Sequence, residues 1–125
     1  MNMEMMENEF KKTIFMDIDG CLIKHKGTVS DMINEPTELL PGVVVKLNEW
    51  EARGYRIILT TGRKESLRKF TEEQLFKVGI FYDQLIMGIN RGERVLINDK
   101  KPNYDKSVAR AIEIERNVGL TDVEI

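Results

Sequence analysis

The chain has 125 residues, a length that suits one domain with its own buried core. Hydrophobic residues (42%) and charged residues (32%) are at ordinary levels for a soluble globular protein, and a formal net charge of −2 does not favour a general binder of duplex nucleic acid. The single cysteine excludes an intrachain disulfide, and no apolar run is long enough to span a membrane.

Residues 1–11 are expected to be a flexible leader that precedes one domain. They carry neither the basic segment nor the apolar segment of a secretory signal. We therefore expect a cytoplasmic protein.

Four short apolar runs each predict a buried strand. Runs that are continuous rather than alternating are typical of strands buried on both faces. The predicted strands span residues 12–17, 56–60, 84–87 and 94–98. Residues 105–116 suit either a fifth strand, over about 110–116, or a helix, and the pattern leaves both open.

A hairpin and two helices are predicted between these strands. Gly20 allows a sharp turn, and residues 22–29 suit a small hairpin followed by a loop to Pro41. Apolar spacing predicts one helix between Pro41 and Gly54 and a second over residues 65–78. This order predicts a single α/β domain with a doubly wound, mainly parallel sheet.

Three of the predicted strands end in polar residues suited to phosphate chemistry. The first is followed by Asp17-Ile18-Asp19-Gly20, the second by Thr61-Gly62-Arg63, and the fourth by Asp99-Lys100. In an open parallel sheet the ligand site lies beyond the carboxyl ends of the strands, so these groups are expected to converge. Clustered carboxylates repel each other unless a cation lies among them. Together with basic and hydroxyl groups, they indicate a hard metal ion and an anionic substrate.

Three segments together are similar to motifs of the haloacid dehalogenase-like (HAD) hydrolase superfamily. They are IFMDIDGCL at residues 14–22, ILTTGR at 58–63 and VLINDKKP at 95–102. The resemblance covers about residues 12–120. It implies a HAD-like Rossmannoid fold and a Mg²⁺-dependent phosphotransferase, most often a phosphatase.

The resemblance also implies a role for each site residue. Asp17 would attack phosphorus and become an aspartyl phosphate, while Asp19 would protonate the leaving oxygen and then deprotonate water. Mg²⁺ would be held by the Asp17 carboxylate, the Asp19 backbone carbonyl and the Asp99 carboxylate. The Thr61 hydroxyl and the Gly62 backbone N–H would bind a phosphoryl oxygen.

Basic residues are expected to complete the phosphate site. Arg63 and Arg91 are the predicted phosphate-binding residues. The family has a lysine before the last motif strand, and residues 87–93 contain none, so Arg91 is the best substitute. Arg94, Lys64 and Lys100 are the alternatives.

Two further positions depart from the family pattern. Cys21 stands where threonine is common, which puts a support of the turn in doubt because cysteine is a poor hydrogen-bond former. Asn98 stands where many members have the first of two adjacent acids, which leaves Asp99 as the expected metal ligand.

The intervals between the motifs leave no room for a cap domain. A capless site is open, which suggests either a large substrate or a homo-oligomer whose neighbour closes the site. Among capless members, the chain most resembles short phosphatases associated with sugar and capsule biosynthesis. We expect a phosphomonoester hydrolase acting on a small phosphorylated substrate such as a sugar phosphate or a nucleotide.

Two other functions are compatible with clustered aspartates. One is a catalytically impaired binding or regulatory module on the same fold, which the missing lysine favours. The other is a phosphoacceptor signalling domain. In such a domain the acidic pair follows the first strand and the phosphorylated aspartate follows the third, whereas here Asp-x-Asp follows the first strand.

Overall fold

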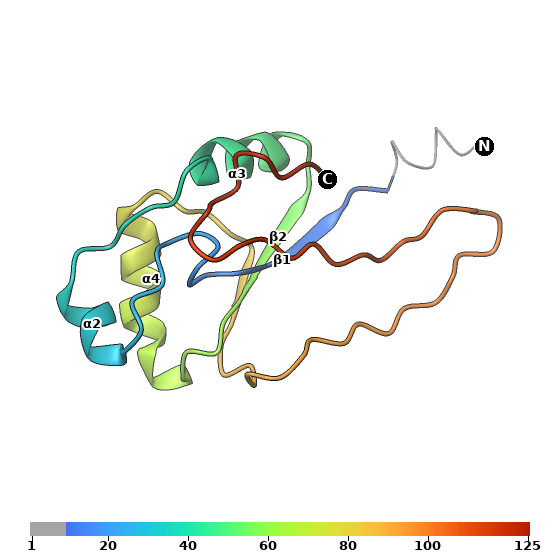
Figure 1. Cartoon of the computed structure of the whole chain (residues 1–125). Helices are drawn as coiled ribbons and strands as arrows, with labels where there is room; N and C mark the ends of the chain where they lie inside the picture. The colour runs from blue at the N-terminus through green and yellow to red at the C-terminus, as the bar shows by residue number, and fades with distance from the viewer. Residues whose placement is uncertain (1–9) are drawn as a thin grey trace.

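A parallel sheet lies at the centre of the computed structural model, which describes residues 10–125 (Figure 1). Its strands are β1 (Thr13–Asp17), β2 (Arg56–Thr60) and β3 (Gln84–Ile86), in the order β1-β2-β3. The predicted α/β class with a parallel sheet is confirmed, and no cap domain is present among the described residues. Most of the predicted leader falls on residues 1–9, which lie outside the described part.

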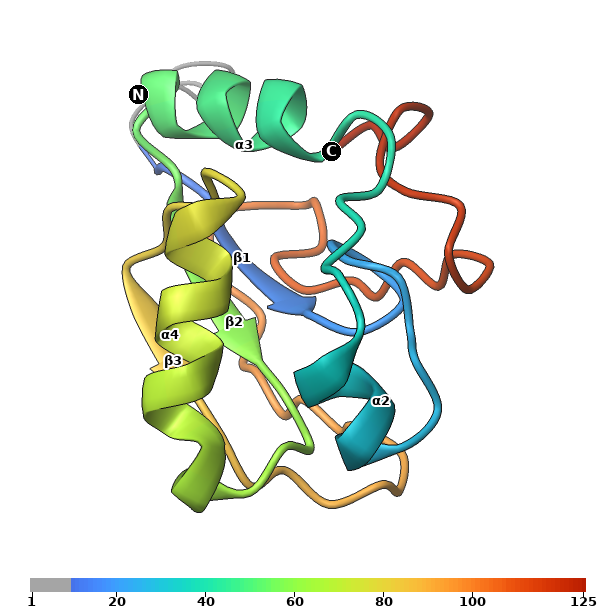
Figure 2. The ribbon, with the colours of Figure 1, turned by 90° about the vertical axis from the view of Figure 1, so that its left-hand side faces the viewer.

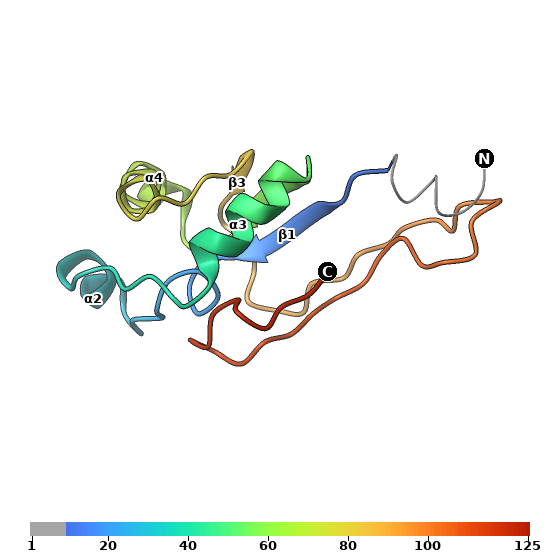
Figure 3. The ribbon, with the colours of Figure 1, turned by 90° about the horizontal axis from the view of Figure 1, so that it is seen from above.

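Two helices make the crossovers between neighbouring strands. Helix α3 (Val43–Ala52) joins β1 to β2, and a 3-10 turn, η1 (Glu65–Leu67), leads into α4 (Arg68–Lys77), which joins β2 to β3. Figures 2 and 3 show both helices on one side of the sheet and the orange part of the chain beyond β3 on the other side, while Leu120 near the C-terminus returns to the core. None of the helices formed by residues 10–125 is both long and apolar enough to cross a membrane.

The sheet is buried unequally on its two faces. Met16, Leu59 and Leu85 share the face toward the helices and belong to the hydrophobic core. On the opposite face, Phe15 is 57% exposed and Ile86 is 39% exposed. Continuous apolar runs predicted burial on both faces, and the face opposite the helices meets that expectation only in part, at Ile58, which is 8% exposed.

The predicted fourth strand, residues 94–98, is not formed. Residues 88–125 contain neither helix nor strand, so the alternatives for 105–116 are both wrong as well. Val95, Leu96 and Ile97 are exposed. An apolar run becomes a strand only where a neighbouring chain supplies backbone hydrogen bonds, and this run has no such ladder.

The segment after β1 also differs from the prediction. The expected hairpin over residues 22–29 is absent; instead Ile23 forms isolated bridges with Asp19 and Leu39. A short helix, α2 (Val29–Asn34), occupies part of the predicted loop. The Thr28 side chain caps this helix by accepting a hydrogen bond from the Asp31 N–H. The Thr-x-x-Asp spacing is a helix-start signal that the sequence analysis missed.

Asn117 and Leu120 form hydrogen bonds with the segment between β1 and α3. The Asn117 N–H donates to the Gly20 carbonyl at 2.9 Å, and the His25 N–H donates to the Asn117 Oδ1 at 2.8 Å. Leu120 is 3% exposed and lies in the core, with its N–H bonded to the Pro41 carbonyl at 2.8 Å. The loop that carries Asp19 is therefore supported from outside the sheet.

Candidate functional site

The first two motifs meet at one edge of the sheet. Strands β1 and β2 end side by side, with Asp17 paired in register with Thr60. The chain then turns after each strand. Gly20 has φ +88°, which favours glycine, and its N–H donates to the Ile23 carbonyl at 2.8 Å. The predicted convergence of these two motifs is thus present in the structure.

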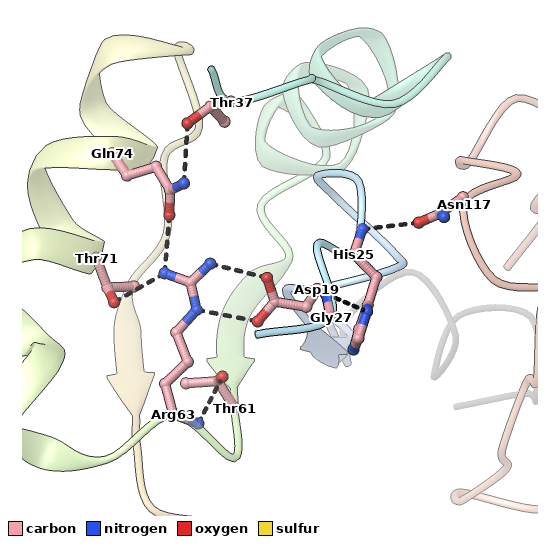
Figure 4. A network of polar contacts seen from close by, with 9 residues as sticks. All are labelled: Asp19, His25, Gly27, Thr37, Thr61, Arg63, Thr71, Gln74 and Asn117. Carbon is pink, nitrogen blue, oxygen red and sulfur yellow. Dashed lines mark hydrogen bonds and ion pairs between the residues drawn. The ribbon is translucent and has the colours of Figure 1, made fainter. Parts of the chain in front are cut away.

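Asp19 forms a bidentate ion pair with Arg63 (Figure 4). The Arg63 Nε–H donates to the Asp19 Oδ2 at 2.9 Å, and an N–H of the terminal NH2 nitrogen donates to Oδ1 at 2.8 Å. The Arg63 side chain is only 4% exposed and that of Asp19 is 24% exposed. Paired N–H···O bonds of this kind fix geometry as well as charge.

The other terminal nitrogen of Arg63 is held by helix α4. It donates to the Thr71 Oγ1 at 3.0 Å and to the Gln74 Oε1 at 2.8 Å. In this arrangement the guanidinium is directed at protein groups rather than at an incoming anion. A direct phosphate contact by Arg63 therefore stays a prediction, while its contact with Asp19 is established by the geometry.

Thr61 and Gly62 differ in how far they are open to a ligand. Thr61 is 3% exposed, and its Oγ1 accepts a hydrogen bond from the Arg63 backbone N–H at 3.1 Å. Gly62 is exposed, and its N–H donates to no described residue. A Cβ at Gly62 would lie 3.3 Å from the Ile89 carbonyl oxygen. The Gly62 N–H is therefore the more accessible donor for an anion.

Asp17 lies in the open at the end of β1. Its side chain is 49% exposed, and its Oδ1 is 3.5 Å from a terminal nitrogen of Arg94, which is 48% exposed. Arg91 is exposed and no contact joins it to Asp17. Of the basic residues considered as substitutes for the family lysine, Arg94 is the one that lies beside the proposed nucleophile.

Asp99 does not join Asp17 and Asp19 in a metal-binding group among the described residues. It forms an ion pair with Lys101, with 2.5 Å between the Asp99 Oδ1 and the Lys101 Nζ. The hydrogen bond and charge of Lys101 lower the pKa of the Asp99 carboxyl below its ordinary value. Within residues 10–125, no three histidine, cysteine, aspartate or glutamate side chains form a group that could hold a metal ion.

The missing strand explains where Asp99 lies. The prediction placed Asp99 at the site because the carboxyl end of a fourth parallel strand would lie at the same edge of the sheet, and that strand is not formed. The side chains of Asp17 and Asp19 alone do not provide a ligand set for Mg²⁺. The described residues, as they are arranged, therefore do not fit the ion that the sequence predicts.

Cys21 follows the Asp-x-Asp motif and stays protonated near neutral pH. Burial, and then the charges of Asp17 and Asp19, raise the pKa of its thiol to about 11. A nucleophilic thiol needs the opposite shift. The side chain also packs against the hydrophobic core, so its role is structural.

Two polar residues on α4 were missed in the sequence. Thr71 (0% exposed) and Gln74 (8% exposed) are buried beside Leu75. Their i, i+3 spacing places them on one helix face, next to apolar positions. A pair of polar residues on the buried side of a predicted helix is the signal that could have indicated a buried charged partner.

Comparison with known proteins supports the fold. The chain matches no protein-family model, and no curated protein matches it. A chain of the Pnkp1/Rnl/Hen1 complex is similar at 31% identity with a TM-score of 0.53, over 68% of this chain and 30% of that chain. A second structure of the Pnkp1/Rnl/Hen1 RNA repair complex gives 31% identity and a TM-score of 0.53, over 69% and 28%. The present chain thus spans less than a third of the length of these similar chains.

A phosphatase is also among the proteins with similar structures. The D,D-heptose 1,7-bisphosphate phosphatase from B. bronchiseptica, complexed with magnesium and phosphate, matches at 17% identity with a TM-score of 0.46. That match covers 61% of this chain and 49% of that one.

Proposed function

We propose that the chain is a phosphomonoester hydrolase of the HAD-like type that works through an aspartyl phosphate on Asp17. The observation that carries the proposal is the meeting of two sequence motifs at one sheet edge. There Asp17 is half exposed, and Asp19 two residues later is held by Arg63 from the second motif. The similarity to a chain of an RNA repair complex, at 31% identity, is compatible with phosphate chemistry.

The proposed reaction assigns separate tasks to the two aspartates. An Asp17 oxygen attacks phosphorus, the bond from phosphorus to the leaving oxygen breaks, and water later cleaves the acyl phosphate. Asp19 supplies a proton to the leaving oxygen and takes one from that water. The second task suits the observed geometry, because a carboxylate oxygen that accepts from Arg63 keeps a further lone pair.

Two cationic or donor groups would receive the phosphoryl oxygens. Arg94 lies beside Asp17 and is exposed, so it offsets the repulsion between a carboxylate nucleophile and an anionic substrate. The accessible Gly62 N–H lies in the loop after β2 and is a second donor. Thr61 and Arg63 stay in the proposal as phosphate-binding residues. The main task of Arg63 is to hold the Asp19 carboxylate.

Mg²⁺ dependence is proposed from the resemblance alone. The described side chains do not assemble a ligand set for the ion, so the tasks above are assigned to the chain's own groups. The assay is direct: hydrolysis should stop when EDTA is added and return with excess Mg²⁺. Full activity in EDTA would remove the metal from the proposal and leave the roles of Asp17 and Asp19 standing.

The proposed substrate class is supported by the open site and by the similarity to a chain of an RNA repair complex. No cap covers the aspartates in the described residues, so the site can admit a phosphate carried on a larger molecule. The likeness to an RNA repair complex favours a nucleotide, or the phosphorylated end of an RNA strand, over a sugar phosphate. A homo-oligomer that closes the site stays part of the proposal and is tested by size-exclusion chromatography with light scattering.

The decisive experiment is hydrolysis of an aryl phosphate and of a panel of phosphorylated nucleotides and sugars. Wild-type protein should release phosphate, Asp17→Asn should not, and the control Asp122→Asn should match the wild type because Asp122 is exposed and distant in sequence from the motifs. No turnover on any substrate by folded wild-type protein would contradict the proposal.

A binding or regulatory module is the second candidate. Two observations favour it: residues 10–125 contain no group of side chains that could hold a metal ion, and protein groups engage Arg63. Phosphate binding without hydrolysis, equal in wild type and Asp17→Asn, would support this reading. A stable phosphorylated protein without turnover would instead indicate a phosphoacceptor.

A further inference from the structure

We propose that Gln74 is a positioning residue for this reaction: it orients Arg63, and Arg63 in turn fixes the Asp19 carboxylate. The inference rests on the proposed function and adds a residue that lies outside both motifs. Gln74 belongs to α4, 57 positions beyond Asp17 by residue number. Gln74 forms no hydrogen bond with either aspartate. It acts through the Arg63 guanidinium, which lies between Gln74 and Asp19.

Both polar atoms of the Gln74 amide are hydrogen-bonded. Its Oε1 accepts a hydrogen bond from Arg63 at 2.8 Å, and its Nε2 donates to the Thr37 Oγ1 at 2.8 Å (Figure 4). The residue is 8% exposed, so few water molecules can replace these partners. Arg63 only donates, so the amide oxygen must face Arg63, and the Thr37 hydroxyl then accepts from the NH2 group on the other side. If the amide turned over, its NH2 group would face the guanidinium donors.

The rigid Arg63 guanidinium links the orientation set by Gln74 to the position of the Asp19 carboxylate. The group is planar, so fixing one terminal nitrogen also fixes the edge that faces Asp19. Thr71 holds the same nitrogen at 3.0 Å, but a hydroxyl rotates and serves as donor or acceptor, whereas the Gln74 oxygen only accepts. The order of contacts is therefore Thr37, Gln74, Arg63, Asp19, from the loop after α2 to the loop after β1.

A neutral amide suits this place better than a carboxylate. Arg63 is nearly buried, and Asp19 is the only acid that forms an ion pair with it in the described residues. A glutamate at position 74 would accept the same hydrogen bond but would also share the positive charge that Asp19 uses. Glutamine fixes the orientation of the Arg63 guanidinium, and Asp19 remains the group that balances its positive charge.

The catalytic test compares Gln74→Leu with the matched control Gln84→Leu, which changes an exposed residue of β3. A misplaced Asp19 should lower kcat by about 10- to 100-fold, while KM stays within about twofold, because substrate is still met by Asp17, Arg94 and Gly62. The control should keep wild-type values. An unchanged kcat in a folded Gln74→Leu protein overturns the inference.

The background variant Asp19→Asn separates positioning from a general loss of structure. If Gln74 acts through Asp19, Gln74→Leu should have no further effect on the residual kcat of Asp19→Asn protein. Equal fold-losses in both backgrounds would show an independent structural effect and would overturn the inference. Gln74→Glu should recover part of the lost kcat, because it keeps the acceptor oxygen.

Hydrogen exchange at the Arg63 side chain tests the role of Gln74 without requiring catalytic activity, so this inference and the proposed phosphatase function can be refuted separately. In ¹⁵N NMR spectra, the buried Arg63 Nε–H should exchange slowly with water in wild-type protein, with its assignment confirmed by Arg63→Lys. Thr37→Val removes only the far hydrogen bond and should accelerate this exchange in a folded protein. An inactive wild type with this acceleration refutes the proposed function alone. Slow exchange in Thr37→Val and Gln74→Leu refutes the inference.

Discussion

Asp19→Asn and Asp17→Asn remove the same charge two residues apart, yet they should affect folding stability very differently. Asp19→Asn leaves a guanidinium whose side chain is 4% exposed without its anion. Breaking a buried pair by removing one partner costs about 3–5 kcal/mol. Because asparagine keeps one acceptor oxygen and Asp19 is 24% exposed, the lower end of that range, about 3 kcal/mol, is expected here.

Asp17→Asn should be nearly neutral for stability. Its carboxylate is 49% exposed, and the Arg94 nitrogen 3.5 Å away is equally open to water. Exposed pairs of this kind contribute about 0–1 kcal/mol. The difference between the two variants is therefore about 2–3 kcal/mol, which corresponds to roughly 10 °C in Tm for a domain of this size.

Urea unfolding followed by circular dichroism measures this difference. The free energy of unfolding is compared for wild type and both variants, with equal m-values as the condition for the comparison. Equal destabilisation of the two variants would refute the reasoning, because it would mean that Arg63 is not buried against Asp19. The same pair of proteins also serves the activity assay, since Asp17→Asn should lose turnover while keeping its fold.

Three further predictions concern the core, a turn and the thiol. Leu75→Ala should lower the free energy of unfolding by about 2–5 kcal/mol, because Leu75 is fully buried. Phe76 is 78% exposed, so Phe76→Ala should change that free energy by no more than about 0.5 kcal/mol, and similar losses in the two variants would contradict the packing of α4. Gly119→Ala should cost at least about 1–2 kcal/mol in urea unfolding, because its φ is +91° and a Cβ would lie 2.3 Å from the Pro41 carbonyl oxygen; wild-type stability would contradict that contact. Alkylation of Cys21, followed by mass spectrometry, should rise roughly tenfold per pH unit from pH 8 toward its pKa of about 11, since only the thiolate reacts; a plateau near pH 9 would show an ordinary thiol.

The first half of the fold could be predicted from local patterns. The apolar run over residues 56–60 corresponds to β2 itself, and helical spacing indicated both α3 and α4. These elements are predictable because their burial and turn signals lie within the element. The meeting of the ends of β1 and β2 at one edge of the sheet followed from the general rule for parallel strands, which needs no knowledge of side-chain contacts.

The remaining features depend on partners that a local pattern does not identify. The apolar run over residues 95–97 shows hydrophobicity but not which strand would pair with it, and it stays exposed. Arg63 and Asp19 are 44 residues apart, so their ion pair depends on how the two loops face each other. The sequence located Arg63 at the site and assigned it to phosphate, while the structure directs it to Asp19, Thr71 and Gln74.

The unequal burial of the two aspartates has a consequence for how the protein responds to ionic strength. Mobile ions screen charges that water surrounds and act weakly on those beneath the surface. Added salt should therefore loosen the contact between Asp17 and Arg94 while leaving the pair of Asp19 and Arg63 intact. Sodium chloride thus offers a reagent that acts on one carboxylate and spares its neighbour, without any change in the amino-acid sequence.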